Sequence, residues 1–262
     1  MTDQKMPQLN ARTVVILIIV GLAAGFLSGM FGVGGGIIII PALITFAGFE
    51  PRLASGTSLT TIVPLALVGV VSYAIEGHVS WVAAGLLALG ALGGSQVGTW
   101  LLSKVRQKWL QLGFAGFMLV SVVMLFVVIP SRDSHIEITW GTALALVVTG
   151  FLTGVLSGLL GVGGGIIVVP ALMLGFGASD LVAKGTSLLM MIPTALSGTI
   201  PNLMRKNLHV PTAIIVGLSA CCTTFLGSFV AHKVSPLAAN VCFAVFLVAV
   251  ATNLIIRALR SK

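Results

Sequence analysis

Apolar residues run along this chain in long stretches, and the charged residues fall at or beside the short breaks between them. A helix that crosses a membrane needs about 20 apolar residues, and most of the stretches are close to that length or exceed it. The pattern therefore predicts an all-α membrane protein. The first half divides into five segments, at residues 13–31, 36–48, 53–75, 79–103 and 109–129, and the second half into their counterparts, which end near residue 256.

The second segment of each half is too short to cross the membrane as a straight helix. The 13 residues of segment 36–48 extend about 20 Å, whereas the hydrocarbon core is about 30 Å thick. We therefore expect a glycine-broken or re-entrant helix near the membrane midplane in each half.

The composition supports a membrane location. The chain has 262 residues, of which 57% are hydrophobic and 8% charged, and its mean hydropathy is +1.15. Its net charge of +8 does not indicate a nucleic-acid-binding protein, because the basic residues cap apolar segments and do not cluster on a polar surface. The cysteines Cys221, Cys222 and Cys242 lie inside apolar runs, so we expect no disulfide, no metal site and no cofactor.

The two halves are copies of one unit. When the sequence is shifted by 129 residues, residues 25–43 align with 154–172 and 14 of these 19 positions are identical. The same shift pairs Pro64 with Pro193 and the motif Gly-Thr-Ser-Leu at 56–59 with that at 185–188. We expect five parts: a cytoplasmic N-terminal segment (1–12), a first membrane repeat (13–130), an external linker (131–138), a second membrane repeat (139–256) and a cytoplasmic C-terminal tail (257–262).

The basic residues predict how the chain is oriented. With a cytoplasmic N-terminus and an odd number of crossings in each half, eleven of the fourteen basic residues lie inside, as expected for cytoplasmic loops. Arg132, Lys184 and Lys233 then lie outside. The two halves are inverted relative to each other, an architecture that recurs in secondary transporters. A topology in which the short segments do not change sides is disfavoured, because it puts the basic loop 104–108 outside.

Small residues recur at every fourth position before the short segments. Gly21, Gly25 and Gly29 are matched by Gly150, Gly154 and Gly158, and Gly90, Gly94 and Gly98 repeat the spacing in the fourth segment. Such stripes let helix backbones approach closely in lipid. We interpret them as packing surfaces.

A run of glycines, Gly-Val-Gly-Gly-Gly, follows each of the first two stripes, at 32–36 and 161–165. Backbone that is not helical is tolerated at membrane depth only inside protein or beside a wet cavity. The helix that starts after each break directs unpaired N–H groups and the positive end of its dipole toward the break, which is a suitable site for an anion. The alternative is a hinge that only lets the helix bend.

Hydroxyl groups near the breaks extend this candidate site, although Ser and Thr also cap helices or bond back to the backbone. The expected substrate-binding residues are Ser28, Gly32, Gly34, Gly35, Gly36, Thr57 and Ser58 in the first half and Ser157, Gly161, Gly163, Gly164, Gly165, Thr186 and Ser187 in the second.

Three further polar residues are lower-ranked candidates for binding the substrate. Gln96 and Asn253 are amides within apolar runs, where bonds between helices are the alternative role. Lys184 either attracts an anion at an outer vestibule or snorkels to the interface. We expect no buried basic residue, so helix ends and hydroxyls must balance most of the charge of a bound anion. Asp, Glu and His lie only near segment ends, so a coupled proton would travel with the substrate or use a peripheral His.

With both glycine runs, both Gly-Thr-Ser-Leu motifs and the prolines in place, the sequence resembles the TauE/SafE family of sulfite and organosulfonate exporters over nearly its whole length. The resemblance implies transport of sulfite, sulfoacetate or a related small oxyanion across the bacterial cytoplasmic (inner) membrane, commonly outward. With the repeats, we expect a secondary transporter whose partners are the small anion, the lipid bilayer and, where transport is coupled, a proton. A homo-oligomer is compatible with it.

Other functions fit the residues less well. A passive anion channel and uptake of a sulfur oxyanion stay open as alternatives. A membrane enzyme is disfavoured because no nucleophile with a base and no metal-ligand cluster occurs in the apolar runs. The glycine runs lack the last glycine of a dinucleotide fingerprint and the Lys of a P-loop.

Overall fold

The computed structural model describes residues 10–101, 138–160, 163–204 and 206–260, together with positions 112, 115–116, 118–123, 126 and 136. Every regular element in the described part is an α-helix, which confirms the all-α prediction. Most of the segment expected at 109–129 lies outside the described residues. The helices are α1 (Ala11–Phe31), α2 (Gly36–Ala47), α3 (Pro51–Ile75), α4 (Trp81–Leu101), α6 (Trp140–Leu160), α7 (Gly165–Phe176), α8 (Asp180–Met204), α9 (Val210–Lys233) and α10 (Pro236–Arg260).

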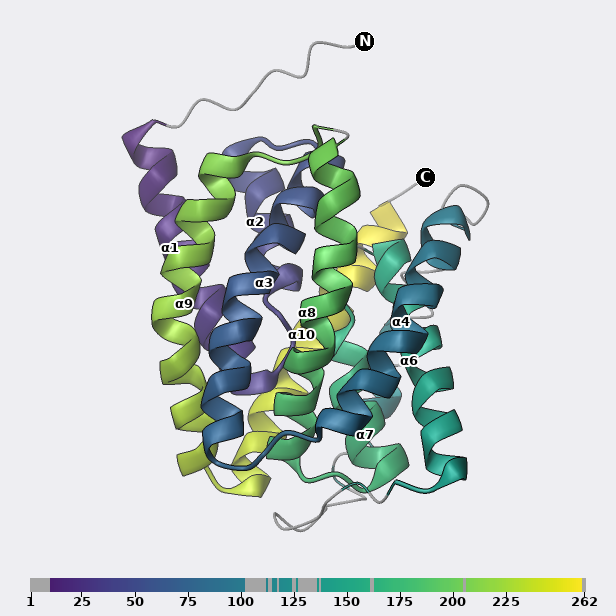
Figure 1. Ribbon diagram of the computed structural model, residues 1–262. Coiled ribbons are helices and arrows are strands. Elements are labelled where there is room, and N and C mark those ends of the chain that lie inside the picture. The colour runs from purple at the N-terminus through teal and green to yellow at the C-terminus, as the bar shows by residue number, and fades with distance from the viewer. Residues whose placement is uncertain are drawn as a thin grey trace.

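The internal repeat is visible in the helix bounds. Adding 129 to the bounds of α1, α2 and α3 gives those of α6, α7 and α8. The short second segment forms a helix of 12 residues in each half. Residues of α2 pack along α1 in one apolar cluster, so the chain turns back on itself after the first break and forms a hairpin (Figure 1).

The glycine stripes lie where helices from different halves touch, which confirms that they are packing surfaces. A Cβ atom on Gly25 of α1 would overlap the carbonyl oxygen of Ala220 on α9. In the same way, a Cβ atom on Gly94 of α4 would overlap the carbonyl oxygen of Phe151 on α6. The pairs α1–α9 and α4–α6 are equivalent under the repeat. Each pair runs parallel, because successive glycines meet successive residues of the partner helix.

Helices α3 and α8 are equivalent and lie against each other in the centre, in opposite directions. Gly56, near the start of α3, packs against Asn202 near the end of α8. Gly185, near the start of α8, packs against Tyr73 near the end of α3. The equivalent helices α3 and α8 are therefore antiparallel, and α1 begins at the same end of the molecule at which α10 ends (Figure 1).

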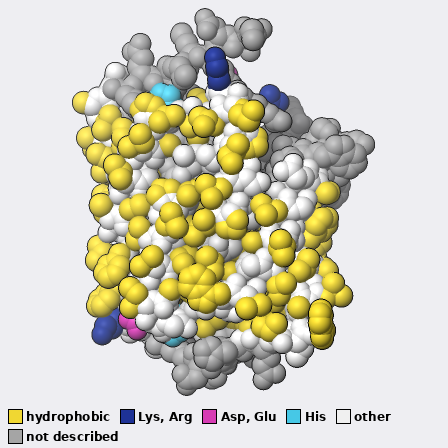
Figure 2. All heavy atoms as spheres, in the orientation of Figure 1, with side chains coloured by type: hydrophobic (Ala, Val, Ile, Leu, Met, Phe, Trp, Pro, Cys, Tyr) yellow, Lys and Arg dark blue, Asp and Glu magenta, His cyan; other side chains and the backbone are white. Residues whose placement is uncertain are grey.

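The outer surface suits contact with lipid. Apolar side chains cover the middle of the face in Figure 2, and the charged side chains visible there lie toward its two ends. Many large side chains on this surface are exposed, including Trp140, Leu218 and Val245. Within the described residues, six helices are long and apolar enough to cross a membrane: α1, α3, α8 and α9, and the stretches Trp81–Gly98 of α4 and Trp140–Gly158 of α6. The protein is a multi-pass membrane protein.

Candidate functional site

The two glycine runs break the helices as the sequence predicts. Gly32 ends α1 with φ of +69°, and its N–H donates to the carbonyl oxygen of Ser28 at 2.7 Å. Gly34 and Gly35 also have positive φ, and Gly35 is the N-cap of α2. In the second half, Gly163 and the N-cap Gly164 repeat these conformations, with φ of +88° and +79°. Residues with a side chain rarely adopt such angles, so glycine is required here.

The two breaks meet in the centre of the molecule. The equivalent glycines Gly34 and Gly163 both face the same two side chains, Ile62 of α3 and Met191 of α8, which are themselves equivalent. Both side chains are fully buried. A Cβ atom on Gly165 would lie 2.7 Å from the carbonyl oxygen of Gly32, so the breaks also touch directly. In this conformation Ile62 and Met191 fill the space between them.

Serines from the central helices reach the breaks unequally. Ser187 Oγ of α8 donates a hydrogen bond to the carbonyl oxygen of Gly32 at 3.0 Å. The equivalent serine, Ser58 of α3, is fully buried, and its hydroxyl has no hydrogen-bond partner in the described part of the chain. Gly161, the counterpart of Gly32, lies outside the described residues.

Thr153 of α6, which is not among the residues expected from the sequence, packs against the start of α7. It is fully buried. Its methyl carbon would lie 2.9 Å from a Cβ atom on Gly164, and Ser157 lies beside the same glycine. Within the described chain, the Thr153 hydroxyl has no hydrogen-bond partner, and neither has that of Ser28 at the first break. A buried hydroxyl without a partner costs about 1 to 3 kcal/mol, so Ser28, Ser58 and Thr153 are candidates for groups that bind a ligand.

Thr57 and Thr186 have another role. The hydroxyl oxygen of Thr57 accepts a hydrogen bond from the backbone N–H of His209, the N-cap of α9, at 3.1 Å. The hydroxyl oxygen of Thr186 accepts one from the N–H of Ser80, just before α4, at 3.0 Å. Each threonine therefore fixes the start of a helix in the other half, which favours the capping alternative for both. His209 lies before the membrane-spanning part of α9, and its burial lowers its pKa.

The charged pair at the start of α8 corrects one expectation. Lys184 is 2% exposed, and its Nζ atom forms an ion pair with Asp180 Oδ2 at 3.1 Å. It neither snorkels nor lines an open vestibule, and the expectation of no buried basic residue is wrong. The Asp180 carboxylate four residues earlier compensates its charge, which makes the burial tolerable. The backbone of Lys184 packs against Gly32, so this buried cation adjoins the first break.

The remaining candidates lie in different surroundings. Gly36 is buried at the first turn of α2, and Gly165 occupies the same place in α7. Gln96 of α4 and Asn253 of α10 have exposed side chains, so the structure does not bring them to the buried breaks. Within the described ranges, no three His, Cys, Asp or Glu side chains come together as a metal site.

The electrostatics at the breaks suit an anion. Helices α2 and α7 both begin there, so the positive ends of two helix dipoles adjoin the same central region. The N-cap glycines present backbone rather than side chain, but the N–H groups of Gly36 and Ile38 already donate to the carbonyl oxygens of Gly34 and Gly35. The hydroxyls of Ser28, Ser58 and Thr153, which have no partner within the described chain, can donate hydrogen bonds to oxygen atoms.

Comparison with known proteins gives consistent matches. A family model described as "Sulfite exporter TauE/SafE" matches residues 3–125 and 145–262. The probable membrane transporter protein YunE of Bacillus subtilis is 26% identical over 218 residues, which cover 74% of this chain and 80% of that protein. A probable membrane transporter protein of Xylella fastidiosa is 30% identical over 186 residues, 69% of this chain and 70% of its own. A third, from Haemophilus influenzae, is 26% identical over 263 residues and covers 93% and 98%.

Proposed function

Because this chain belongs to the TauE/SafE sulfite exporter family, and is a membrane transporter like its relatives, we propose that it moves a small anion by alternating access. The proposed substrates are sulfite, sulfoacetate or another organosulfonate or oxyanion. The proposed direction is export across the bacterial inner membrane.

The observation that carries this proposal is the set of buried hydroxyls without partners beside two converging helix starts. Ser28, Ser58 and Thr153 are each fully buried, and no described residue bonds to their hydroxyls. A sulfite or sulfonate group has three oxygen atoms that accept hydrogen bonds, and hydroxyl and backbone N–H donors match them. Donors of this kind bind an anion without a full opposing charge.

The arrangement of the halves supports alternating access. The antiparallel pair α3–α8 contains Ile62 and Met191, which close the centre from both halves at once. We infer that the halves lie inverted in the membrane and that a rocking movement withdraws these side chains toward one end at a time. Met191 is suited to this because its thioether is flexible and adapts to different surroundings.

The orientation follows from charge. Arg12, Arg52, Lys206 and Arg260 belong to the end at which α1 begins, whereas Lys184 and Lys233 belong to the other end. The excess of basic residues at the first end supports cytoplasmic N- and C-termini. With this orientation, an anion bound at breaks near the membrane midplane can be released to either side of the membrane.

The test is counterflow of radiolabelled sulfite or sulfoacetate into proteoliposomes that hold the unlabelled anion. The variants Ser58→Ala and Thr153→Val should reduce the rate at least about tenfold, since a lost hydrogen bond to a charged group costs about 1.5 to 3 kcal/mol. Thr199→Val is the matched control, because its buried hydroxyl also lacks a described partner but lies about two turns of α8 beyond Met191. It should transport at the wild-type rate.

Two results would overturn the proposal. Wild-type rates in both Ser58→Ala and Thr153→Val would show that these hydroxyls do not bind the anion. Single-channel currents without counterflow would instead support the passive anion channel.

A further inference from the structure

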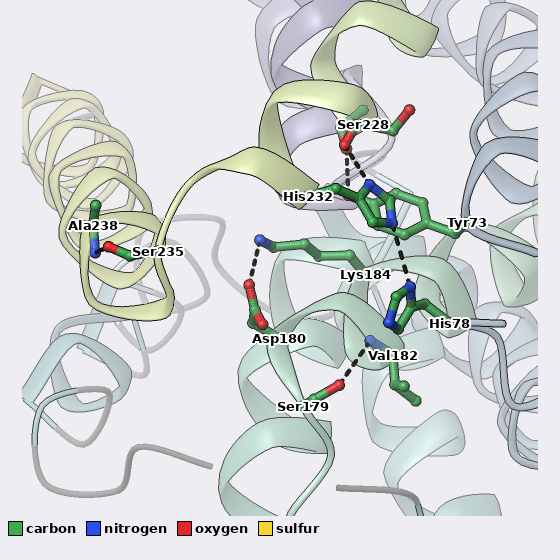
Figure 3. Close-up of polar contacts among 11 residues, drawn as sticks. Tyr73, His78, Ser179, Asp180, Val182, Lys184, Ser228, His232, Ser235 and Ala238 are labelled. Carbon is green, nitrogen blue, oxygen red and sulfur yellow. Dashed lines mark hydrogen bonds and ion pairs between the residues drawn. The ribbon is translucent and has the colours of Figure 1, made fainter. Parts of the chain in front are cut away.

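Two histidines from different halves meet at the end of the molecule opposite the first residues of α1. His78 lies between α3 and α4, and His232 lies in the last turn of α9. His232 Nε2 and His78 Nδ1 are 3.3 Å apart, and the ring centroids are 5.2 Å apart (Figure 3). Both side chains are half-buried. The pair is separate from the hydroxyls proposed to bind the anion.

The hydrogen bonds restrict where protons lie on this pair. His232 Nδ1 is 2.7 Å from the carbonyl oxygen of Ser228 and must donate to it, because a carbonyl only accepts. In the neutral pair, His232 Nε2 therefore accepts from His78 Nδ1–H. When a proton is added, the same two nitrogens can keep their bond, with the charge on either ring. A second proton is opposed by repulsion between the two rings, so the geometry suits one proton shared by the pair.

Other titratable groups surround the pair. Helix α3 contributes Tyr73, whose ring lies 5.1 Å from that of His232, and the exposed Glu76 at its C-cap. Helix α8 contributes the ion pair of Asp180 and Lys184 (Figure 3). On α9, the Nζ atom of Lys233 lies 5.6 Å from the ring centroid of Phe229.

These neighbours connect the histidines to the first glycine break. The Tyr73 hydroxyl donates to the carbonyl oxygen of Gly29, in the last turn of α1, at 2.7 Å. The backbone of Lys184 packs directly against Gly32. Through the ring of Tyr73, which lies 5.1 Å from that of His232, the histidine pair is linked to the end of α1, where the chain enters the break.

The residues that the repeat makes equivalent to this cluster could not form a second one at the other end. The residues 129 positions away from His78, His232, Tyr73, Lys184 and Asp180 are Asn207, Ser103, Asn202, Ser55 and Pro51, and none of them titrates near neutral pH. The cluster is therefore specific to one end of the molecule.

From these observations we propose that His78 and His232 together bind one proton and couple its movement to anion transport. This inference rests on the proposed transport function. The ligand is a proton, which enters at the end where α8 begins, and imidazole is the side chain that takes it up near neutral pH. The protonated pair adds positive charge beside Lys184 and so stabilises an anion at that end.

Proteoliposome assays test the coupling. Counterflow of sulfite, measured between about pH 5 and about pH 8, should change with pH in the wild type, by at most about tenfold per pH unit for one proton. An outward sulfite gradient should also move protons, which trapped pyranine dye reports. In His78→Gln and His232→Gln, the pH dependence and the proton signal should disappear, while counterflow at pH of about 7.5 stays within about twofold of wild type. The control His209→Gln changes a buried histidine at the opposite end, bonded to Thr212, and should leave both signals intact.

The possible outcomes separate the two proposals. Absent counterflow in the wild type at every pH contradicts the proposed function itself. Counterflow that is present but independent of pH, or that keeps its pH dependence in both histidine variants, overturns the proton site alone. Nitrogen-15 NMR of labelled histidines in the wild-type protein supplies a readout that needs no variant. It should show His78 and His232 taking up one proton jointly in this range, and independent titration of the two rings would contradict the inference.

Discussion

Ser58 and Ser187 hold equivalent positions on α3 and α8, yet their hydroxyls are in different states. Ser187 Oγ donates to the carbonyl oxygen of Gly32 at 3.0 Å, whereas Ser58 Oγ has no partner in the described part of the chain. Both residues are fully buried. These two serines, which occupy equivalent positions in the repeat, therefore differ: Ser187 stabilises a break, whereas the Ser58 hydroxyl is available for the proposed anion.

This difference predicts opposite effects of the same substitution. Ser187→Ala should destabilise the protein by about 1 to 2 kcal/mol, because the carbonyl oxygen of Gly32 loses its partner inside the membrane. Ser58→Ala should leave stability unchanged or raise it slightly, because it removes a buried hydroxyl that has no partner. Thermal unfolding in detergent measures both. Equal losses in the two variants would contradict the assignment.

The glycine stripes predict a strong dependence on position within one helix. In α4, a Cβ atom on Gly94 would overlap the backbone of Phe151, but one on Gly85 would meet nothing within 4 Å. Gly94→Ala should therefore separate α4 from α6 and cost at least about 1 to 3 kcal/mol. Gly85→Ala should be neutral or stabilise by up to about 1 kcal/mol, because alanine restricts the unfolded chain more. The melting temperatures and the yield of monodisperse protein should differ accordingly, and similar behaviour of the two variants would refute the close contact.

The buried ion pair predicts non-additive effects. Asp180→Asn should destabilise the protein by about 3 to 5 kcal/mol, because it removes the carboxylate that compensates the buried Lys184. The double variant Asp180→Asn with Lys184→Met should recover most of this loss, since neither charge is then buried. A double-mutant cycle of unfolding free energies measures the coupling. A double variant as unstable as the sum of the single variants would show that the two charges act independently.

The sequence was informative wherever the chain repeats itself. The apolar segments and the helix breaks at both glycine runs are predicted correctly, and the shift of 129 residues matches the helix bounds. These features depend on the local sequence, through the length of each apolar run and the positions of glycine. The short segment expected at 36–48 became α2, Gly36–Ala47. The packing role of the small-residue stripes was also predicted, since helical spacing alone places Gly21, Gly25 and Gly29 on one face.

The parts that the sequence did not predict depend on contacts between distant residues. Thr153 was overlooked because its counterpart in the first half is Ala24, so comparison of the repeats gave no signal there. The capping role of Thr57 depends on His209, 152 residues away. The burial of Lys184 had a local signal, since Asp180 lies four residues earlier on the same helix, a spacing typical of ion pairs. The meeting of His78 with His232 needed the three-dimensional arrangement.

The reciprocal threonine caps also set an order for biosynthesis. The N–H of Ser80 before α4 needs the hydroxyl of Thr186, which follows 106 residues later. At a synthesis rate of about 5 to 20 residues per second, that interval is about 5 to 20 seconds. During it the first half has entered the membrane, but α4 still lacks its anchor. The N–H of His209 can bond to Thr57 only after most of the chain has been made. Each half is therefore synthesised with one helix start whose hydrogen-bond partner lies in the other half.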